Sequence, residues 1–116
     1  EFMAGVSRHP GFPPCVMFGL GGIFAEAYRD FAIRLSPLSM DDALELVGSL
    51  RTGALLGAYR NMEEVNREAL AEILVRLGDL ALDFPQVDEI DLNPIIIVNG
   101  LPVVADALIL TREENT

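Results

Sequence analysis

Lysine is absent from this sequence. All eight basic residues are arginine, and eighteen acidic residues oppose them, which gives a formal net charge of −10. A protein that binds nucleic acid needs a basic surface to neutralise phosphates, and segments that dock on anionic lipid are basic for the same reason. The composition therefore argues against nucleic acid and the membrane surface as partners.

Cysteine, histidine and long apolar runs are scarce as well. Cys15 is the only cysteine and His9 the only histidine, so neither an internal disulfide nor a Cys/His zinc cluster can form. No apolar run approaches the roughly 18 residues that span a bilayer, and the N-terminus lacks the pattern of a signal peptide. We therefore expect a reducing, cytoplasmic location.

The sequence does have the composition of one folded domain: 116 residues, of which 51% are hydrophobic and 22% charged. Residues 1–14 predict an irregular arm, because prolines and glycines crowd it; the frayed remains of a strand are the alternative. Glu1-Phe2 precedes Met3 and is typical of residues left by cloning. We expect residues 15–110 to form the domain and residues 111–116 a polar tail.

Two helices are predicted, over residues 40–51 and 63–84. Ser39 stands before the first helix with an acidic residue three positions later, which is typical of a helix N-terminus. The second helix carries apolar residues at helical spacing from Leu70 to Phe84, which predicts one buried stripe.

The other apolar segments have the alternation of strands. The expected strands are 15–18, 23–28, 31–35, 87–93, 95–98 and 101–110. The first two would form a hairpin through the glycine-rich turn 19–22, and Asn99-Gly100 predicts a second hairpin. The expected fold class is α+β, a mostly antiparallel sheet of about four to six strands with two helices packed on one face.

Three polar side chains interrupt the last hairpin. Asp91 and Asn93 share one face of their strand because side chains alternate. A two-residue turn at 99–100 places Asp106 directly opposite Asn93. Oxygen ligands at this spacing suit Mg²⁺, which takes one or two protein groups together with substrate phosphates. Solvated strand ends are the alternative.

Two further expectations concern the same hairpin. Ile95 and Ile97 should share the face of Asp91, nearer the turn and covered by helices. The ladder should break near Pro94, because proline cannot donate a backbone hydrogen bond.

The run Asp91-Leu92-Asn93-Pro94, with Asp106 thirteen residues after Asn93, also resembles a known family. It is similar to the C-terminal part of the ATP-grasp domain of ADP-forming acyl-CoA synthetases, which are related to the succinyl-CoA synthetase beta chain. The segments that carry this resemblance are 16–26, 34–38, 69–77 and 89–94.

The resemblance implies a function and roles for these residues. The family reaction is acyl-CoA + ADP + phosphate ⇌ acid + CoA + ATP, with Mg²⁺ and ATP or ADP as cofactors. Asn93 and Asp106 would match metal ligands, and Asp91 would match a catalytic acidic residue near the phosphoryl group in transit. CoA would bind elsewhere in the parent protein.

Four more residues are candidates for cofactor binding. Gly21 and Gly22 could cradle phosphate with their N–H groups, or simply form a structural turn. Arg34 could approach nucleotide phosphates or form a salt bridge. Glu26 matches a position of the family.

The sequence departs from the family in length, because a complete ATP-grasp enzyme holds its nucleotide between two subdomains. We therefore expect the remaining ATP-grasp half and the CoA-binding domains to be partners, and the 116-residue chain alone to be inactive. The alternative is a non-catalytic interaction or regulatory module. In that alternative, a sheet face or edge left bare by the missing half would be a partner-binding surface and would favour self-association into a homo-oligomer.

Overall fold

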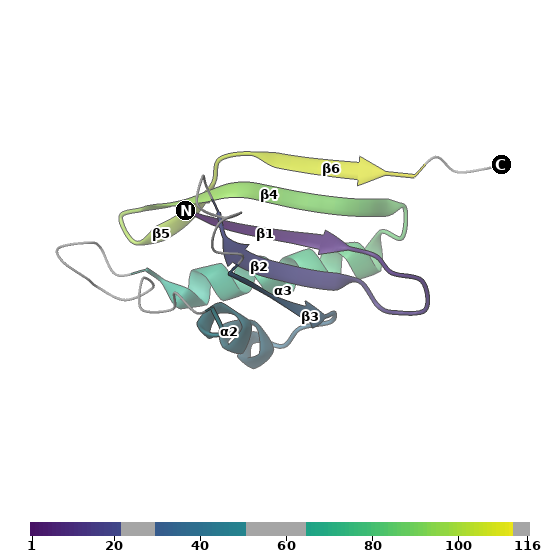
Figure 1. Ribbon diagram of the computed structural model, residues 1–116, viewed down its shortest axis with the longest axis horizontal. Coiled ribbons are helices and arrows are strands. Elements are labelled where there is room, and N and C mark those ends of the chain that lie inside the picture. Colours follow the sequence, from purple (N-terminus) through teal and green to yellow (C-terminus); the bar gives the residue numbers. More distant parts are fainter. Residues whose placement is uncertain (22–29, 51–64, 113–116) are drawn as a thin grey trace.

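The computed structural model describes residues 1–21, 30–50 and 65–112. One sheet runs through these residues in the strand order β3-β2-β1-β4-β5, and β6 also pairs with β4, along the part of β4 that precedes its pairing with β5 (Figure 1). All pairings are antiparallel. The elements are β1 Phe2–Ser7, β2 Cys15–Leu20, β3 Phe31–Leu35, α2 Met40–Gly48, α3 Arg67–Asp83, β4 Val87–Val98, β5 Leu101–Val104 and β6 Ala107–Thr111.

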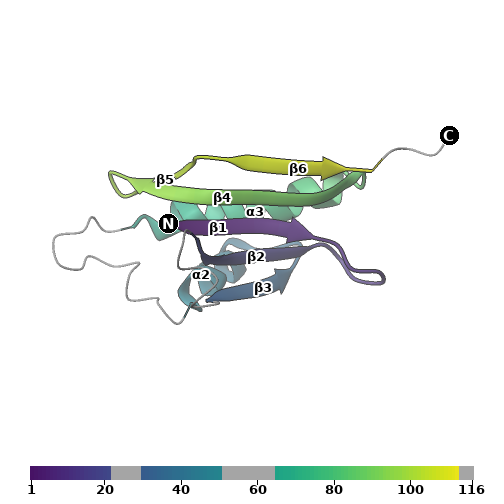
Figure 2. The same cartoon turned by 45° about the horizontal axis from the view of Figure 1, so that its top comes forward.

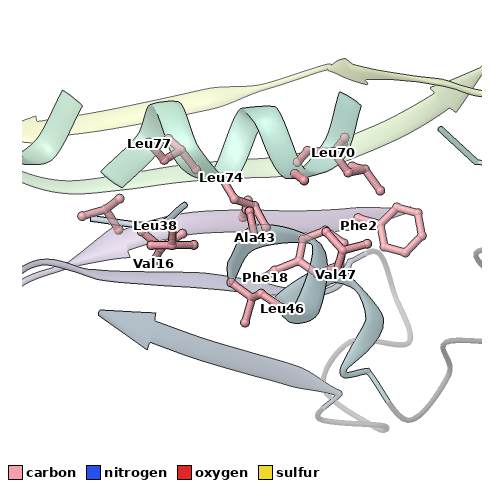
Figure 3. Close-up of a cluster of buried hydrophobic side chains, with 14 of the residues drawn as sticks. Phe2, Val16, Phe18, Leu38, Ala43, Leu46, Val47, Leu70, Leu74 and Leu77 are labelled. Carbon is pink, nitrogen blue, oxygen red and sulfur yellow. The ribbon is translucent and has the colours of Figure 1, made fainter. Parts of the chain in front are cut away.

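The predicted fold class is confirmed. Both α2 and α3 lie on one face of the sheet (Figure 2), where α3 contacts β1, β2 and β5 and α2 contacts β3. Their apolar stripes and the covered side of the sheet form the core (Figure 3). Its largest fully buried side chains are Phe18, Leu70, Leu74, Ile95, Val16 and Val47. The opposite face of the sheet has no helix over it in the described part of the chain.

The predicted irregular arm is wrong for residues 2–7, which form β1 between β2 and β4. Phe2, Ala4 and Val6 alternate along this strand and are buried, as side chains on one face of a strand are. The ring of Phe2 stacks on Phe18 with a centroid distance of 5.4 Å. Phe2 is therefore part of the core.

Both helices form close to the predicted limits. Ser39 caps α2 as expected: its Oγ accepts a bond from the Asp42 N–H at 3.0 Å, and its own N–H donates to the Asp42 carboxylate at 3.1 Å. The helix ends at Gly48, three residues before the predicted end. The cap of α3 is Asn66, whose side chain accepts from the Ala69 N–H. No helix in the described ranges is long and apolar enough to cross a membrane.

The predicted hairpin between 15–18 and 23–28 cannot be compared, because 22–29 lies outside the described residues. The strand β2 continues through Gly19 and Leu20, however, and pairs with β3. A Cβ at Gly19 would lie 2.8 Å from the Cβ of Phe31. This close approach accounts for the glycine without a turn at that position.

The second hairpin is confirmed. Val98 pairs with Leu101, and both residues between them have positive φ, 52° at Asn99 and 79° at Gly100. Such backbone angles are those of the tight turns that asparagine and glycine favour.

Candidate functional site

The side chains of β4 change the faces of the sheet on which they alternate, within a few residues. Leu92 pairs with Ala4 of β1 and Ile95 pairs with Phe2, so β4 contains one extra residue between the two pairs. A bulge of this kind reverses which face the following side chains occupy. Ile90 before the bulge and Ile95 after it are both buried under the helices.

This bulge corrects one prediction. Asp91 and Asn93 alternate with the helix-facing residues Ile90 and Leu92, so they lie on the uncovered face. Ile95 and Ile97, by contrast, pack against the core on the other face of the sheet. The simple alternation from Asp91 fails because the extra residue shifts the phase by one.

The predicted pairing of Asn93 with Asp106 is confirmed. The Asn93 N–H donates to the Asp106 carbonyl at 3.1 Å, and the Ala105 N–H donates to the Pro94 carbonyl at 3.0 Å. The predicted break is also present, because β5 ends at Val104 and β6 begins at Ala107. Both Asn93 and Asp106 are exposed to solvent.

A row of neighbouring residues crosses the uncovered face at Asp91. Its order across the sheet is Ile33, Met17, Gly5, Asp91 and Leu108. Asp91 is half-buried, whereas Ile33 and Leu108 are each 55% exposed. The row places one carboxylate in the middle of an apolar strip, with a glycine on one side of it.

The donor chemistry of this face fits Mg²⁺. Asp91 and Asp106 offer carboxylates, Asn93 offers an amide oxygen, and opposed residues on paired strands lie close together. One Asp106 oxygen, Oδ1, accepts from the Ala107 N–H at 2.9 Å, and a carboxylate can accept further bonds or ligate in addition. No group of three His, Cys, Asp or Glu side chains gathers as a metal site among the described residues. The set therefore suits an ion that completes its shell with water and phosphate.

The structure does not bring Arg34 to this face. Arg34 pairs in the sheet with the fully buried Val16, which places it on the helix side. Its Nη1 lies 3.0 Å from a Glu45 carboxylate oxygen and 3.8 Å from one of Asp42. Of the two roles left open by the sequence, the salt bridge is the one observed.

Gly21 has a structural reason to be glycine. Its N–H donates to the Glu1 carbonyl at 3.0 Å, and a Cβ would lie 2.7 Å from the Phe2 carbonyl oxygen. This N–H is already used within the sheet, which favours a structural role over phosphate binding. Gly22 and Glu26 lie outside the described residues.

The sequence did not reveal the apolar residues that β3 exposes on the uncovered face of the sheet. Phe31, Ile33 and Leu35 alternate in β3, and they are 50%, 55% and 44% exposed. The smaller Ala32 packs toward the helices instead. The sequence did not settle which side of β3 faces the helices, because Arg34 shares the phase of Ala32 and its partners on α2 are known only from the fold.

Comparison with known proteins defines the class first. Residues 1–110 match the family described as the ATP-grasp domain, and the chain belongs to that family. The relatives that it resembles are ADP-forming CoA ligases and an acetyl-coenzyme A synthetase. The resemblance found in the sequence is thereby confirmed.

Three relatives illustrate the match. The chain is 43% identical over 107 residues to the beta subunit of ADP-forming acetate–CoA ligase I from Pyrococcus furiosus, covering 92% of this chain and 46% of that protein. It is 34% identical over 114 residues to ADP-forming acetate–CoA ligase I from Archaeoglobus fulgidus, covering 97% of this chain and 17% of that protein. The chain thus spans less than half the length of these curated relatives.

The third relative is a solved structure. It is the dinucleotide-forming acetyl-coenzyme A synthetase 1 of Candidatus Korarchaeum cryptofilum, in complex with coenzyme A and Mg-AMPPCP. It superposes with a TM-score of 0.91 at 40% identity, over 97% of this chain and 53% of that chain. The fold of the chain is therefore that of about half of this solved chain.

Proposed function

We propose that this chain supplies the Mg-nucleotide-binding wall of the ATP-grasp cleft in an ADP-forming acyl-CoA synthetase. The observation that supports the proposal is the backbone pairing of Asn93 with Asp106, two residues along β4 from Asp91, which faces the side of the sheet that the described helices leave uncovered. The match to ATP-grasp synthetases supports it independently.

The three side chains would have different tasks. The Asn93 amide oxygen and the Asp106 carboxylate would hold Mg²⁺, which neutralises phosphate charge when it is bound. Asp91 is half-buried, lies on the same strand as Asn93, and pairs with Gly5 of the neighbouring strand β1. It would position the reacting phosphate, because phosphoryl transfer depends mainly on positioning and charge stabilisation.

The parts that complete the reaction would come from beyond this chain. The other ATP-grasp half would close over the nucleotide, and CoA would bind on further domains of the parent protein, as the length of the relatives supports. By itself the chain would bind MgADP weakly and turn nothing over. We place the parent enzyme in the cytoplasm, in line with a single buried, unpaired cysteine.

The test is an alanine pair at Asn93 and Asp106 in the full-length enzyme. We expect acyl-CoA-dependent ATP formation to fall by roughly 100-fold or more, because charge stabilisation at the phosphates is lost. Circular dichroism and thermal unfolding should remain close to the parent, because both side chains are exposed. Asp79→Ala is the matched control, since it removes an exposed carboxylate from α3 on the opposite side.

A second candidate function rests on the uncovered apolar residues Phe31, Ile33 and Leu108. A face of this kind also fits a non-catalytic module that binds a partner protein. The alanine pair separates the two. Unchanged activity in a well-folded double variant would favour the interaction module and contradict the Mg-nucleotide wall.

A further inference from the structure

The strand β6 forms an open edge of the sheet. It pairs with β4 on one side, and no other described strand lies on its other side. All five of its residues are exposed, with Leu108 at 55%, Ile109 at 51% and Leu110 at 44%. Its sequence, Ala-Leu-Ile-Leu-Thr, contains neither a charge nor a proline, the usual protections of an edge strand against pairing.

The hydrogen bonds to β4 show which backbone groups of β6 face outward. The Asp106 carbonyl accepts from Asn93, and the Arg112 N–H donates to the Gln86 carbonyl. Backbone groups alternate in direction along an edge strand. The N–H and C=O groups of Ala107, Ile109 and Thr111 therefore point away from the sheet.

This edge is complementary to itself. If β6 pairs antiparallel with another β6 about Ile109, the outward groups of residues 107, 109 and 111 all meet outward groups of the other strand. Leu108 then lies opposite Leu110 of the second copy, and Asp106 lies opposite Arg112. Opposed side chains in such pairs are close enough for apolar and ionic contact.

The charges at the two ends support this register. Arg112 is 58% exposed and lies 3.5 Å from Asp88, and a guanidinium with five donors can serve a second carboxylate. The register therefore puts opposite charges together at both ends of the pair. Asp106 is also a proposed metal ligand, but the backbone pairing about Ile109 does not require its side chain.

We propose that the partner of the β6 edge is a second copy of this chain, bound by antiparallel pairing of the two β6 strands about Ile109. The two sheets then form one continuous sheet, with the helices of both copies on the same face. This inference does not rest on the proposed function, because it uses none of the nucleotide chemistry.

The first test measures the mass of the 116-residue chain by sedimentation equilibrium across a range of concentrations. We expect a dimer, and we expect Ile109→Lys to abolish it, because the two introduced charges would lie directly opposite each other. Phe12→Lys is the matched control: it places the same charge at a side chain that is 65% exposed in the connection between β1 and β2, strands that β4 separates from β6, and the dimer should persist. A monomeric parent chain, or a dimer that survives Ile109→Lys, would overturn the proposal.

A third variant examines the competing surface. Ile33→Lys places the charge on the uncovered sheet face, and the dimer should again persist. If Ile33→Lys dissociates the dimer and Ile109→Lys does not, the sheet face is the interface and the β6 proposal is wrong.

The second test does not depend on how well a lysine variant folds. Hydrogen-bonded residues opposed across antiparallel strands have Cα atoms about 5.5 Å apart, within the range of a disulfide. Oxidation of Ile109→Cys should give a covalent dimer, whereas Phe12→Cys should give none, and native Cys15 is buried. The absence of a linked dimer from Ile109→Cys would contradict the proposed register.

Discussion

At the scale of single residues, Gly5 is held in place by its neighbour in the sheet. A Cβ at Gly5 would lie 2.6 Å from the Ile90 carbonyl oxygen, a backbone atom that cannot turn away. We expect Gly5→Ala to lower the free energy of unfolding by about 1–3 kcal/mol, the usual range for overpacking. Urea denaturation measures the difference.

Gly48 provides the control for this prediction. It lies in α2, and a Cβ there meets nothing within 4 Å. Gly48→Ala should be neutral or stabilising by up to about 1 kcal/mol, because alanine favours helix. Equal effects of the two substitutions would show that the contact with Ile90 is not the cause.

Asp42 makes the stability of the protein depend on pH. Its pKa lies below the ordinary value of 3.8 because the Ser39 backbone N–H bonds its carboxylate, with further contributions from the Ser39 side chain and Arg34. A pKa that is lower in the folded state means that the stabilisation is complete above 3.8 and is lost as pH falls through the folded-state pKa.

The measurement compares the parent with Asp42→Ala in denaturation experiments at several pH values. The difference in the free energy of unfolding should be largest above pH 4 and should shrink as the pH falls below about 3.8. A difference that grows toward low pH would contradict the assignment.

At the scale of elements, Arg8 ties the end of β1 to the end of α3. Its guanidinium donates to the carbonyls of Ala81 at 2.6 Å, Phe84 at 3.2 Å and Val87. The last carbonyls of a helix have no partner within the helix, and α3 has no basic residue in its last turn. Arg8 supplies both the hydrogen bonds and the positive charge.

Arg8→Ala should therefore lower the free energy of unfolding by about 1.5–3 kcal/mol, as expected for hydrogen bonds to a charged group. Arg8→Lys should recover only part of this, because an ammonium cannot span several carbonyls as a planar guanidinium does. Thermal unfolding of the two variants beside the parent is the test. Full recovery by lysine would show that charge alone matters.

The elements also show how far the sequence could predict this fold. The helices were predictable because their apolar residues recur at helical spacing and Ser39 marks one start. The Asn99-Gly100 hairpin was predictable because its turn demands positive φ. The pairing of Asn93 with Asp106 followed from that turn and needed no knowledge of the tertiary structure.

The failures have tertiary causes. β1 was missed because its small residues, Ala4 and Gly5, gave a weak pattern that only the packing against β4 explains. The face of Ile95 was missed because one extra residue in β4 reverses the alternation. The role of Arg34 in a salt bridge could be assigned only from the position of α2 beside β3.

At the scale of the whole molecule, residues 2–7 form β1, the strand in the middle of the sheet. Phe2 is 6% exposed and stacks on Phe18. Phe2→Ala should lower the free energy of unfolding by about 3–5 kcal/mol, the usual cost of removing a buried aromatic ring. Phe12→Ala, at a side chain that is 65% exposed, should change it by less than about 0.5 kcal/mol.

Chemical denaturation of the two phenylalanine variants measures these changes in the free energy of unfolding. A small effect at both positions would mean that β1 is dispensable, contrary to its place between β2 and β4.

The central place of β1 has a consequence for biosynthesis. β1, β2 and β3 precede β4 in the chain, so these strands can pair before the ribosome has made β4. One side of β1 must wait for β4, because Val6 pairs with Ile90 and Phe2 with Ile95. During synthesis the polypeptide therefore carries a partly formed sheet with unpaired backbone groups along β1 until β4 has been made, and this is the interval in which a chaperone would protect it.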